Sequence, residues 1–180
     1  VCSSESVRVF PPQRSRQSDI FSFMSNNVSS ERSVEVTVGE IAKELARIKK
    51  EGGKTVAVVG PVVVHTGGSE AFADLLREGY IHGLLSGNAL AVHDIEYQLF
   101  GTSLGIELKT GKTRNQGHRN HMRAINRINY HGSVKKAIEA GDLKSGIMYE
   151  TVSNNIPYCL AGSIRDDGPL PETEMDIIRA

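Results

Sequence analysis

The sequence lacks the features that mark membrane proteins, disulfide-stapled proteins and nucleic-acid-binding proteins. It has two cysteines, Cys2 and Cys159, too few for a disulfide framework or a zinc signature, so we expect a reducing, cytoplasmic compartment. Its longest apolar run, residues 56–64, is far too short to cross a bilayer, and residues 1–16 have no apolar signal-peptide core. Basic and acidic residues balance at 21 each. We therefore expect no membrane and no nucleic-acid partner.

What the sequence does contain is the composition of a globular protein. Its 180 residues are 39% hydrophobic and 23% charged, which suits one domain with a real core. Glycine is frequent, with 18 residues, many of them beside small polar side chains. The sequence opens on Val1 rather than Met, and residues 172–180 look like the first turns of a helix without a stop signal. We therefore expect a portion of a larger enzyme.

Hydrophobic periodicity predicts alternating helices and strands. Apolar residues at spacings of three and four predict a helix over 38–50. The β-branched run at 54–60 is typical of a strand buried on both faces of a parallel sheet, and 62–64 is a candidate extension of it. This alternation predicts an α/β domain with a parallel sheet flanked by helices. Further strands are expected at 81–85 and 157–161, and further helices at 69–77, 89–100, 118–130, 133–140 and 143–153.

A glycine turn follows the first predicted strand. Ligands of open parallel sheets bind beyond the carboxyl ends of the strands. Gly67 and Gly68 let a backbone approach a ligand closely, and Thr66 and Ser69 offer hydroxyls before a helix whose N-terminus favours phosphate. The segment is neither a Gly-x-Gly-x-x-Gly nor a Walker motif. A phosphate cradle and a plain helix start explain it equally well.

The second strand end is followed by Gly87 and Asn88, and then by His93 and Asp94 about one and a half turns into a helix. Asn88 fits either a helix cap or a group that holds a carboxylate or carboxamide. The His93–Asp94 pair fits either an exposed helix face or a site where Asp94 binds an amine or takes its proton.

A third loop and a basic cluster complete the polar segments. After the third strand come Gly162, Ser163, Arg165 and Asp166, which fit a turn with a local ion pair or a binding loop that converges with the other two. The segment 117–123 offers an exposed basic face or a clamp for a carboxylate or phosphate through Arg119 and Asn120. Its two histidines lack further ligands at zinc spacing, so no metal is expected.

Four of these segments together resemble one family. Residues 60–70, 86–96, 117–126 and 161–171 are similar, in order, to the archaeal-type ornithine cyclodeaminases, also described as LOR/SDH conserved-region proteins. The same family forms the C-terminal part of cyanobacterial arginine-degrading enzymes. The resemblance implies a deoxyhypusine-synthase-like NAD-binding fold, and a reaction that converts L-ornithine to L-proline and ammonia with NAD used catalytically. It also implies that the domain continues beyond residue 180.

The resemblance fixes the motifs, and the chemistry of the candidate residues suggests their roles. We expect residues 1–35 to be the end of a preceding domain and a linker, and 36–180 to be the N-terminal portion of the NAD-binding catalytic domain. A homo-oligomer is expected. The alternatives are a non-catalytic NAD-binding regulatory module, and an NAD-dependent enzyme acting on a lysine-derived or proline-type substrate. The candidates are Asp94, Asn88 and His93 for catalysis, Thr66, Gly67, Gly68, Ser69, Gly87, Gly162 and Ser163 for NAD, and Arg119, Asn120, Arg165 and Asp166 for the amino-acid substrate.

Overall fold

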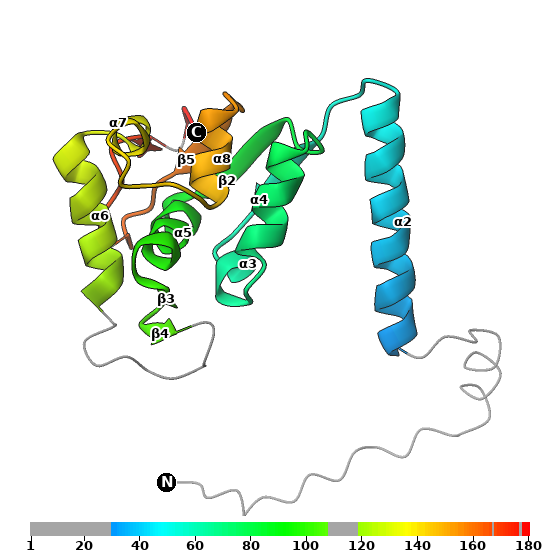
Figure 1. The fold of residues 1–180 in the computed structure, drawn as a ribbon, viewed down its shortest axis with the longest axis horizontal. Helices are drawn as coiled ribbons and strands as arrows, with labels where there is room; N and C mark the ends of the chain where they lie inside the picture. Colours follow the sequence, from blue (N-terminus) through cyan, green and yellow to red (C-terminus); the bar gives the residue numbers. More distant parts are fainter. Residues whose placement is uncertain (1–29, 108–118, 167, 177) are drawn as a thin grey trace, which may run out of the picture. The chain divides into compact units, whose positions relative to one another are not determined.

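The computed structural model describes residues 30–107, 119–166, 168–176 and 178–180, and the chain divides into two compact units, 1–44 and 45–180 (Figure 1). Helix α2 (Ser30–Lys50) contributes to both units. It confirms the helix predicted at 38–50, although it begins earlier. Because α2 runs through residues 35 and 36, the domain boundary placed between them stays a prediction.

Four parallel strands form the sheet of the second unit. The sheet order is β1-β2-β5-β6. Val58 of β1 pairs with Leu85 of β2, which pairs in turn with Cys159 of β5. The α/β fold with a parallel sheet is therefore confirmed. The strands are β1 (Val56–Val59), β2 (Gly83–Gly87), β5 (Tyr158–Ala161) and β6 (Thr173–Glu174).

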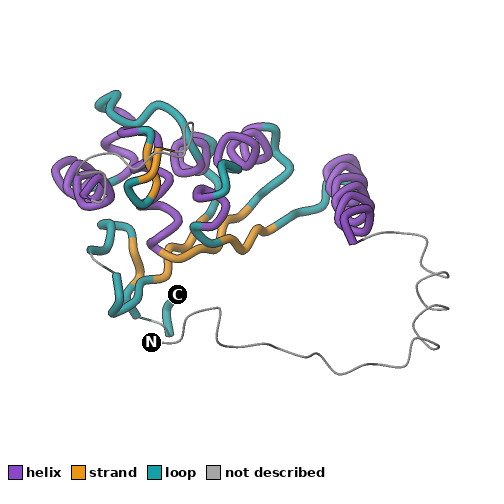
Figure 2. Tube along the Cα trace, turned by 90° about the horizontal axis from the view of Figure 1, so that it is seen from below, coloured by secondary structure: helices purple, strands orange, loops and turns teal. Residues whose placement is uncertain are grey.

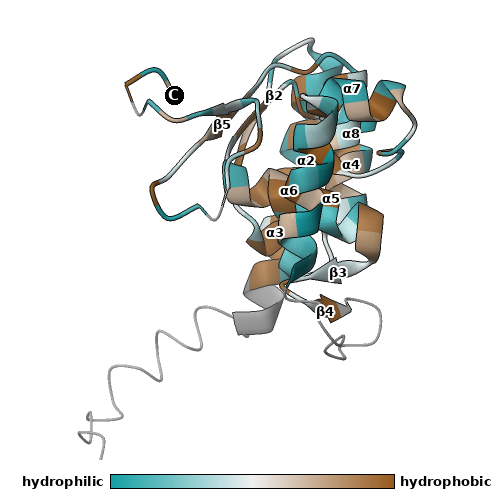
Figure 3. Ribbon diagram, turned by 90° about the vertical axis from the view of Figure 1, so that its left-hand side faces the viewer, coloured by the Kyte–Doolittle hydropathy of each residue, from teal (hydrophilic) through white to brown (hydrophobic). Residues whose placement is uncertain are grey.

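The helices that follow β1 lie on one side of this sheet (Figure 2). Leu84 points into their core and is fully buried. Helix α6 shows why such helices pack: Ile125 and Ile128 are buried, whereas Arg127 on the same helix is exposed. Figure 3 shows hydrophobic and hydrophilic stretches side by side on the helices. The helices are α3 (Val62–His65), α4 (Ser69–Arg77), α5 (Asn88–Phe100), α6 (Asn120–His131), α7 (Val134–Glu139) and α8 (Ile147–Ser153).

The other side of the sheet corrects a prediction. The first strand was expected to be buried on both faces, but Val58 is 77% exposed and Leu85 is 44% exposed. Strand β1 is an edge strand among those described, and the helices beyond it cover one side only. Cys159 lies in the same row and is half-buried.

Three local predictions are also wrong. Residues 62–64 form the helical turn α3 instead of a strand extension, because Pro61 with a φ of −64° starts a helix readily. The segment 172–180 contains strand β6 where helical turns were expected. The helix predicted from 143 begins only at Ile147, because Gly146 has a φ of +103°, outside the helical region.

A β-hairpin with a two-residue turn follows α5. Strands β3 (Thr102–Ser103) and β4 (Ile106–Glu107) pair antiparallel. Leu104 and Gly105 between them both have positive φ, at +51° and +77°, as a type I′ turn requires. The rest of the loop expected at 101–117, from residue 108 on, lies outside the described residues. Within the described part of the chain, no helix is long and apolar enough to cross a membrane.

Candidate functional site

A cleft of about 200 Å³ opens at the carboxyl edge of the sheet. Helix α5 begins directly after β2, so its first turns lie at this edge. The loop after β5 closes the other side, and α6 supplies the rest. The cleft brings together four of the predicted residues. Its lining is formed by Asn88, Ala89, Val92, His93, His121, Ile125, Arg165, Asp166 and Gly168.

Asn88 holds the loop that closes the cleft. Its side chain is buried, its Nδ2 donates to the carbonyl oxygen of Gly168 at 3.2 Å, and its Oδ1 accepts from the Leu170 N–H at 3.0 Å and the Thr173 hydroxyl at 2.9 Å. The residue that caps α5 is Gly87, so capping is not what the Asn88 side chain does. Because both ends of the amide are engaged, Asn88 shapes the cleft.

The loop itself presents Arg165 and Asp166 to the cleft. Asp166 accepts a hydrogen bond from the Ser163 N–H at 2.8 Å, and the Ser163 hydroxyl accepts one from the Arg165 N–H at 3.2 Å. These hydrogen bonds stabilise the turn of the loop. Arg165 is exposed and lines the cleft. A cation at this place suits an anionic substrate group.

His93 is a titratable side chain of the cleft with a buried partner. Its Nδ1 lies 2.9 Å from a carboxylate oxygen of Glu96, which is fully buried. A carboxylate has no hydrogen to give, so Nδ1 donates and Nε2 is the nitrogen that can accept a proton. Sequence reasoning missed Glu96. Its spacing of three from His93 on a predicted helix was the available signal.

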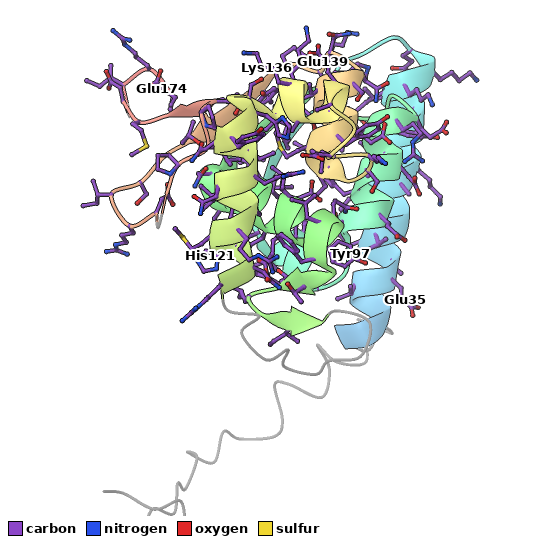
Figure 4. The ribbon with its side chains drawn as sticks, turned by 60° about the vertical axis from the view of Figure 1, so that its left-hand side comes forward. Glu35, Tyr97, His121, Lys136, Glu139 and Glu174 are labelled. Carbon is purple, nitrogen blue, oxygen red and sulfur yellow. The ribbon has the colours of Figure 1, made fainter. Side chains whose placement is uncertain are left out.

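Two more imidazoles flank His93. The ring of His65 lies edge-on at 4.8 Å, and that of His121, near the start of α6 (Figure 4), lies at 6.2 Å. The His65 Nδ1 is 2.7 Å from the Ser103 hydroxyl. Burial lowers the pKa of His65, as does the neighbouring His93, while Glu96 opposes the shift. The described residues contain no group of three or more histidine, cysteine, aspartate or glutamate side chains arranged to hold a metal ion.

Asp94 lies elsewhere, in the interior. It is fully buried, and its carboxylate accepts from the Ser69 hydroxyl at 2.6 Å and from the Met148 N–H at 2.8 Å. Burial raises the pKa of Asp94, against the lowering effect of these hydrogen bonds. Asp94 is outside the set of described residues that line the cleft. It joins α5 to the first turns of α4 and α8.

The N–H groups of Gly67 and Gly68 in the glycine turn already donate to the carbonyl oxygens of Val64 and Val63, at 2.9 and 2.8 Å, so a ligand would meet the first turn of α4 beyond them. Gly67 has a φ of +81° and open space where a side chain would lie, and Gly68 caps α4 without a side-chain bond. The first N–H groups of a helix have no partners inside it, so they remain available to an anion. The hydroxyls are engaged within the fold: Thr66 donates to Val62 at 2.7 Å, and Ser69 donates to Asp94.

The remaining candidates are scattered. Gly162 lies so close to β6 that an added side-chain carbon would meet Met175 at 2.1 Å, so its small size serves the sheet. Gly87 ends β2 with ordinary space around it. Arg119 is exposed just before α6, whereas Asn120 is buried and donates to the Thr102 hydroxyl at 2.9 Å. The structure therefore gathers Asn88, His93, Arg165 and Asp166, and separates Arg119 and Asn120 from this lining.

Comparison with family models identifies the domain. A model described as the Rossmann fold of the arginine dihydrolase ArgZ-like C-terminal region matches residues 39–180, and a model of the first region of the same C-terminal part matches residues 1–38.

Curated relatives agree with these models. The chain is 53% identical, over its whole length, to the bifunctional arginine dihydrolase/ornithine cyclodeaminase AgrE of Nostoc sp., of which it covers 26%. It is 52% identical, again over its whole length, to the ornithine cyclodeaminase of Archaeoglobus fulgidus, of which it covers 44%. The chain thus spans less than half the length of these relatives.

Solved structures share the fold. The ternary complex of AgrE with ornithine and NAD⁺ matches with a TM-score of 0.80 and 56% identity over 84% of this chain and 22% of that one. A LOR/SDH protein of Methanococcus maripaludis matches with a TM-score of 0.78 and 51% identity over 84% of this chain and 48% of the other.

Proposed function

Since the chain belongs to the family of ArgZ-like C-terminal Rossmann-fold domains, we propose that it forms the first part of an NAD-dependent ornithine cyclodeaminase. Its relatives carry that name, and one neighbour is a complex with ornithine and NAD⁺. The reaction releases ammonia from L-ornithine and closes the ring of L-proline. A cytoplasmic location, a role in arginine degradation and assembly into a homo-oligomer stay predictions.

The observation that carries the proposal is the His93–Glu96 pair at the cleft. Ring closure on ornithine needs an amine that has lost its proton, and a leaving amine that gains one. An imidazole whose Nδ1 is held by a buried carboxylate presents Nε2 as a group that can take up and return such a proton. We assign this acid–base role to His93, and we assign the anchoring of α4 and α8 to Asp94.

Arg165 supplies the second requirement, which is a hold on the substrate carboxylate. Its side chain lines the cleft together with His93, and its backbone is fixed by the turn at Ser163. A guanidinium binds a carboxylate through two parallel hydrogen bonds, which orients the substrate as well as attracting it. Asn88 keeps this loop in place through Gly168.

The glycine turn fits the dinucleotide. Gly67 leaves open space beside its backbone, and the first N–H groups of the adjacent helix α4 have no acceptor within the helix, a combination that suits a pyrophosphate. When bound, NAD supplies a reversible acceptor for the hydride on the substrate Cα. The protein residues bind and orient the substrate, move its protons and limit the access of water.

Proton NMR of the intact protein, with NAD and L-ornithine, tests the proposal directly. We expect the signals of proline to grow with time, and to require NAD. Cofactor binding without any proline would favour the alternative of a regulatory NAD-binding module. Conversion of a lysine-derived or proline-type compound with ornithine left intact would favour the alternative of a related amino-acid enzyme.

A further inference from the structure

Glu96 is a buried carboxylate on which four donors converge. It is fully shielded from solvent. Its Oε2 accepts from His93 Nδ1 at 2.9 Å and from the Leu104 N–H at 3.3 Å. Its Oε1 accepts from the Thr102 hydroxyl at 2.9 Å and from the Gly105 N–H at 3.4 Å. The Thr102 hydroxyl and the two backbone N–H groups donate to Glu96, and an ionised carboxylate accepts from His93 when the imidazole carries its hydrogen on Nδ1.

Three of these donors come from the β3–β4 hairpin. Leu104 and Gly105 form its turn, and both have the positive φ that aims their N–H groups back toward α5. A buried carboxylate left without these donors would be costly, because the interior cannot replace the lost water. The hairpin therefore fixes Glu96, and Glu96 in turn is fixed where it meets His93.

The same cluster continues into α6. The Thr102 hydroxyl, while donating to Glu96, accepts from Asn120 Nδ2 at 2.9 Å. The side-chain Oδ1 of Asn120 accepts a hydrogen bond from the Arg123 guanidinium at 3.2 Å. Asn120, which the sequence suggested for substrate binding, has a place in this chain of hydrogen bonds. Connected polar groups of this kind fix one arrangement of side chains far better than a single pair does.

A second hairpin contact reaches the neighbouring imidazole. The Ser103 hydroxyl is 2.7 Å from His65 Nδ1, and the His65 ring packs edge-on against His93. His93 is therefore confined on two sides, by Glu96 through a hydrogen bond and by His65 through ring packing.

We propose that Glu96 is a positioning residue for the cyclodeaminase reaction, because it fixes the orientation of His93 and keeps its hydrogen on Nδ1. The inference rests on the proposed function in one respect, the acid–base role of His93. Glu96 lies outside the described cleft lining and is hydrogen-bonded to the lining residue His93. Its effect on the reaction passes through the imidazole, whose free Nε2 is the nitrogen that serves the substrate.

The test combines NMR of the imidazole nitrogens with steady-state proline production, both in the intact protein. The signals of His93 are identified among the six histidines by their loss in His93→Gln. We expect wild-type His93 to carry its hydrogen on Nδ1 at neutral pH. Finding it on Nε2 would overturn the proposal, whatever any variant shows.

Glu96→Gln keeps the size of the side chain but can both donate and accept. We expect the fixed hydrogen on Nδ1 to be lost, and kcat to fall by about tenfold to a hundredfold with little change in KM. The matched control is Thr102→Val, which removes a donor to Oε1 and leaves the His93 bond to Oε2 in place. The control should lower thermal stability and leave the His93 signals unchanged.

The outcomes separate the two ideas. Unchanged His93 signals in Glu96→Gln would overturn the positioning role, and so would an equal change in Thr102→Val, which would make the effect one of packing. If Glu96→Gln loses the fixed hydrogen but forms proline at the wild-type rate, the contact stands and the acid–base role of His93 fails instead.

Discussion

Helix α5 carries two fully buried carboxylates, Asp94 and Glu96, and they do different things. Asp94 faces the interior, where it accepts from Ser69 at the start of α4 and from Met148 in the first turn of α8. Glu96 faces the cleft side, where it holds His93 and the β3–β4 hairpin. Two residues along a helix is a turn of about 200°, so neighbours in sequence serve opposite faces.

The contrast shows that burial and an acidic group do not by themselves identify a catalytic residue. Both carboxylates are out of reach of solvent, and both are satisfied by several donors. What differs is the partner. Asp94 accepts hydrogen bonds from a backbone N–H and a hydroxyl of neighbouring helices. Glu96, in addition to such donors, is hydrogen-bonded to an imidazole that lines a cleft.

The largest effect on turnover is expected at His93. His93→Gln keeps a hydrogen-bonding side chain toward Glu96 but removes the group that exchanges protons. Proline formation at saturating NAD and ornithine should fall by about a hundredfold or more, while the protein stays folded. Steady-state assays with circular dichroism as the check on folding measure this. A variant within about twofold of the wild-type rate would remove His93 from the proton-transfer role.

The largest effect on stability is expected on the opposite face. Asp94→Ala would leave the Met148 N–H and the Ser69 hydroxyl without their acceptor, and would open a cavity. The free energy of unfolding should fall by about 3 kcal/mol. Urea denaturation measures the loss. A change below about 1 kcal/mol would mean that Asp94 does not join α4 and α8 as described.

The sequence predicted the alternation of strands and helices well, because parallel strands and amphipathic helices leave strong periodic patterns. It located Asn88, His93, Arg165 and Asp166 at one edge from strand ends alone, and these residues do share a cleft. It favoured Asp94 over His93 for proton transfer, because adjacent helix residues differ by about 100° and only packing determines which of them faces the cleft. Glu96 escaped notice because its role depends on a hairpin formed by residues 102–107.

A smaller effect, on the cofactor, tests the glycine turn. Gly67→Val should weaken NAD affinity by about tenfold or more, because its side chain would occupy the space beside the backbone. Gly79→Val is the matched control, since Gly79 also has a positive φ, +69°, and nothing within 4 Å. In both variants the free energy of unfolding should fall by a similar amount, about 1 to 2 kcal/mol, which is the cost of backbone strain at a positive φ. Calorimetry showing equal NAD affinities in the two variants would remove this turn from the site.

The smallest effect is a pH dependence of stability that distinguishes the two faces. Burial raises the pKa of Asp94 above its ordinary 3.8, so its contribution to stability is present in full below that pH. That contribution is lost as the pH rises through the folded-state pKa. Relative to the wild type, Asp94→Asn should therefore gain stability between acid and neutral pH. Urea denaturation at several pH values would show a constant difference if the carboxyl titrated normally.

The division of roles between Asp94 as an anchor and His93 as the acid–base group can be tested at Asp94 itself. Asparagine can replace Asp94 with its amide donating to the Ser69 oxygen and its carbonyl oxygen accepting from Met148. The decisive measurement is the rate of proline formation by folded Asp94→Asn with saturating NAD and ornithine. We predict a rate within about threefold of the wild type, far from the loss expected for a proton-transfer group. A fall of about a hundredfold in this rate with NAD binding intact would contradict the anchoring role of Asp94 and return the catalytic role to it.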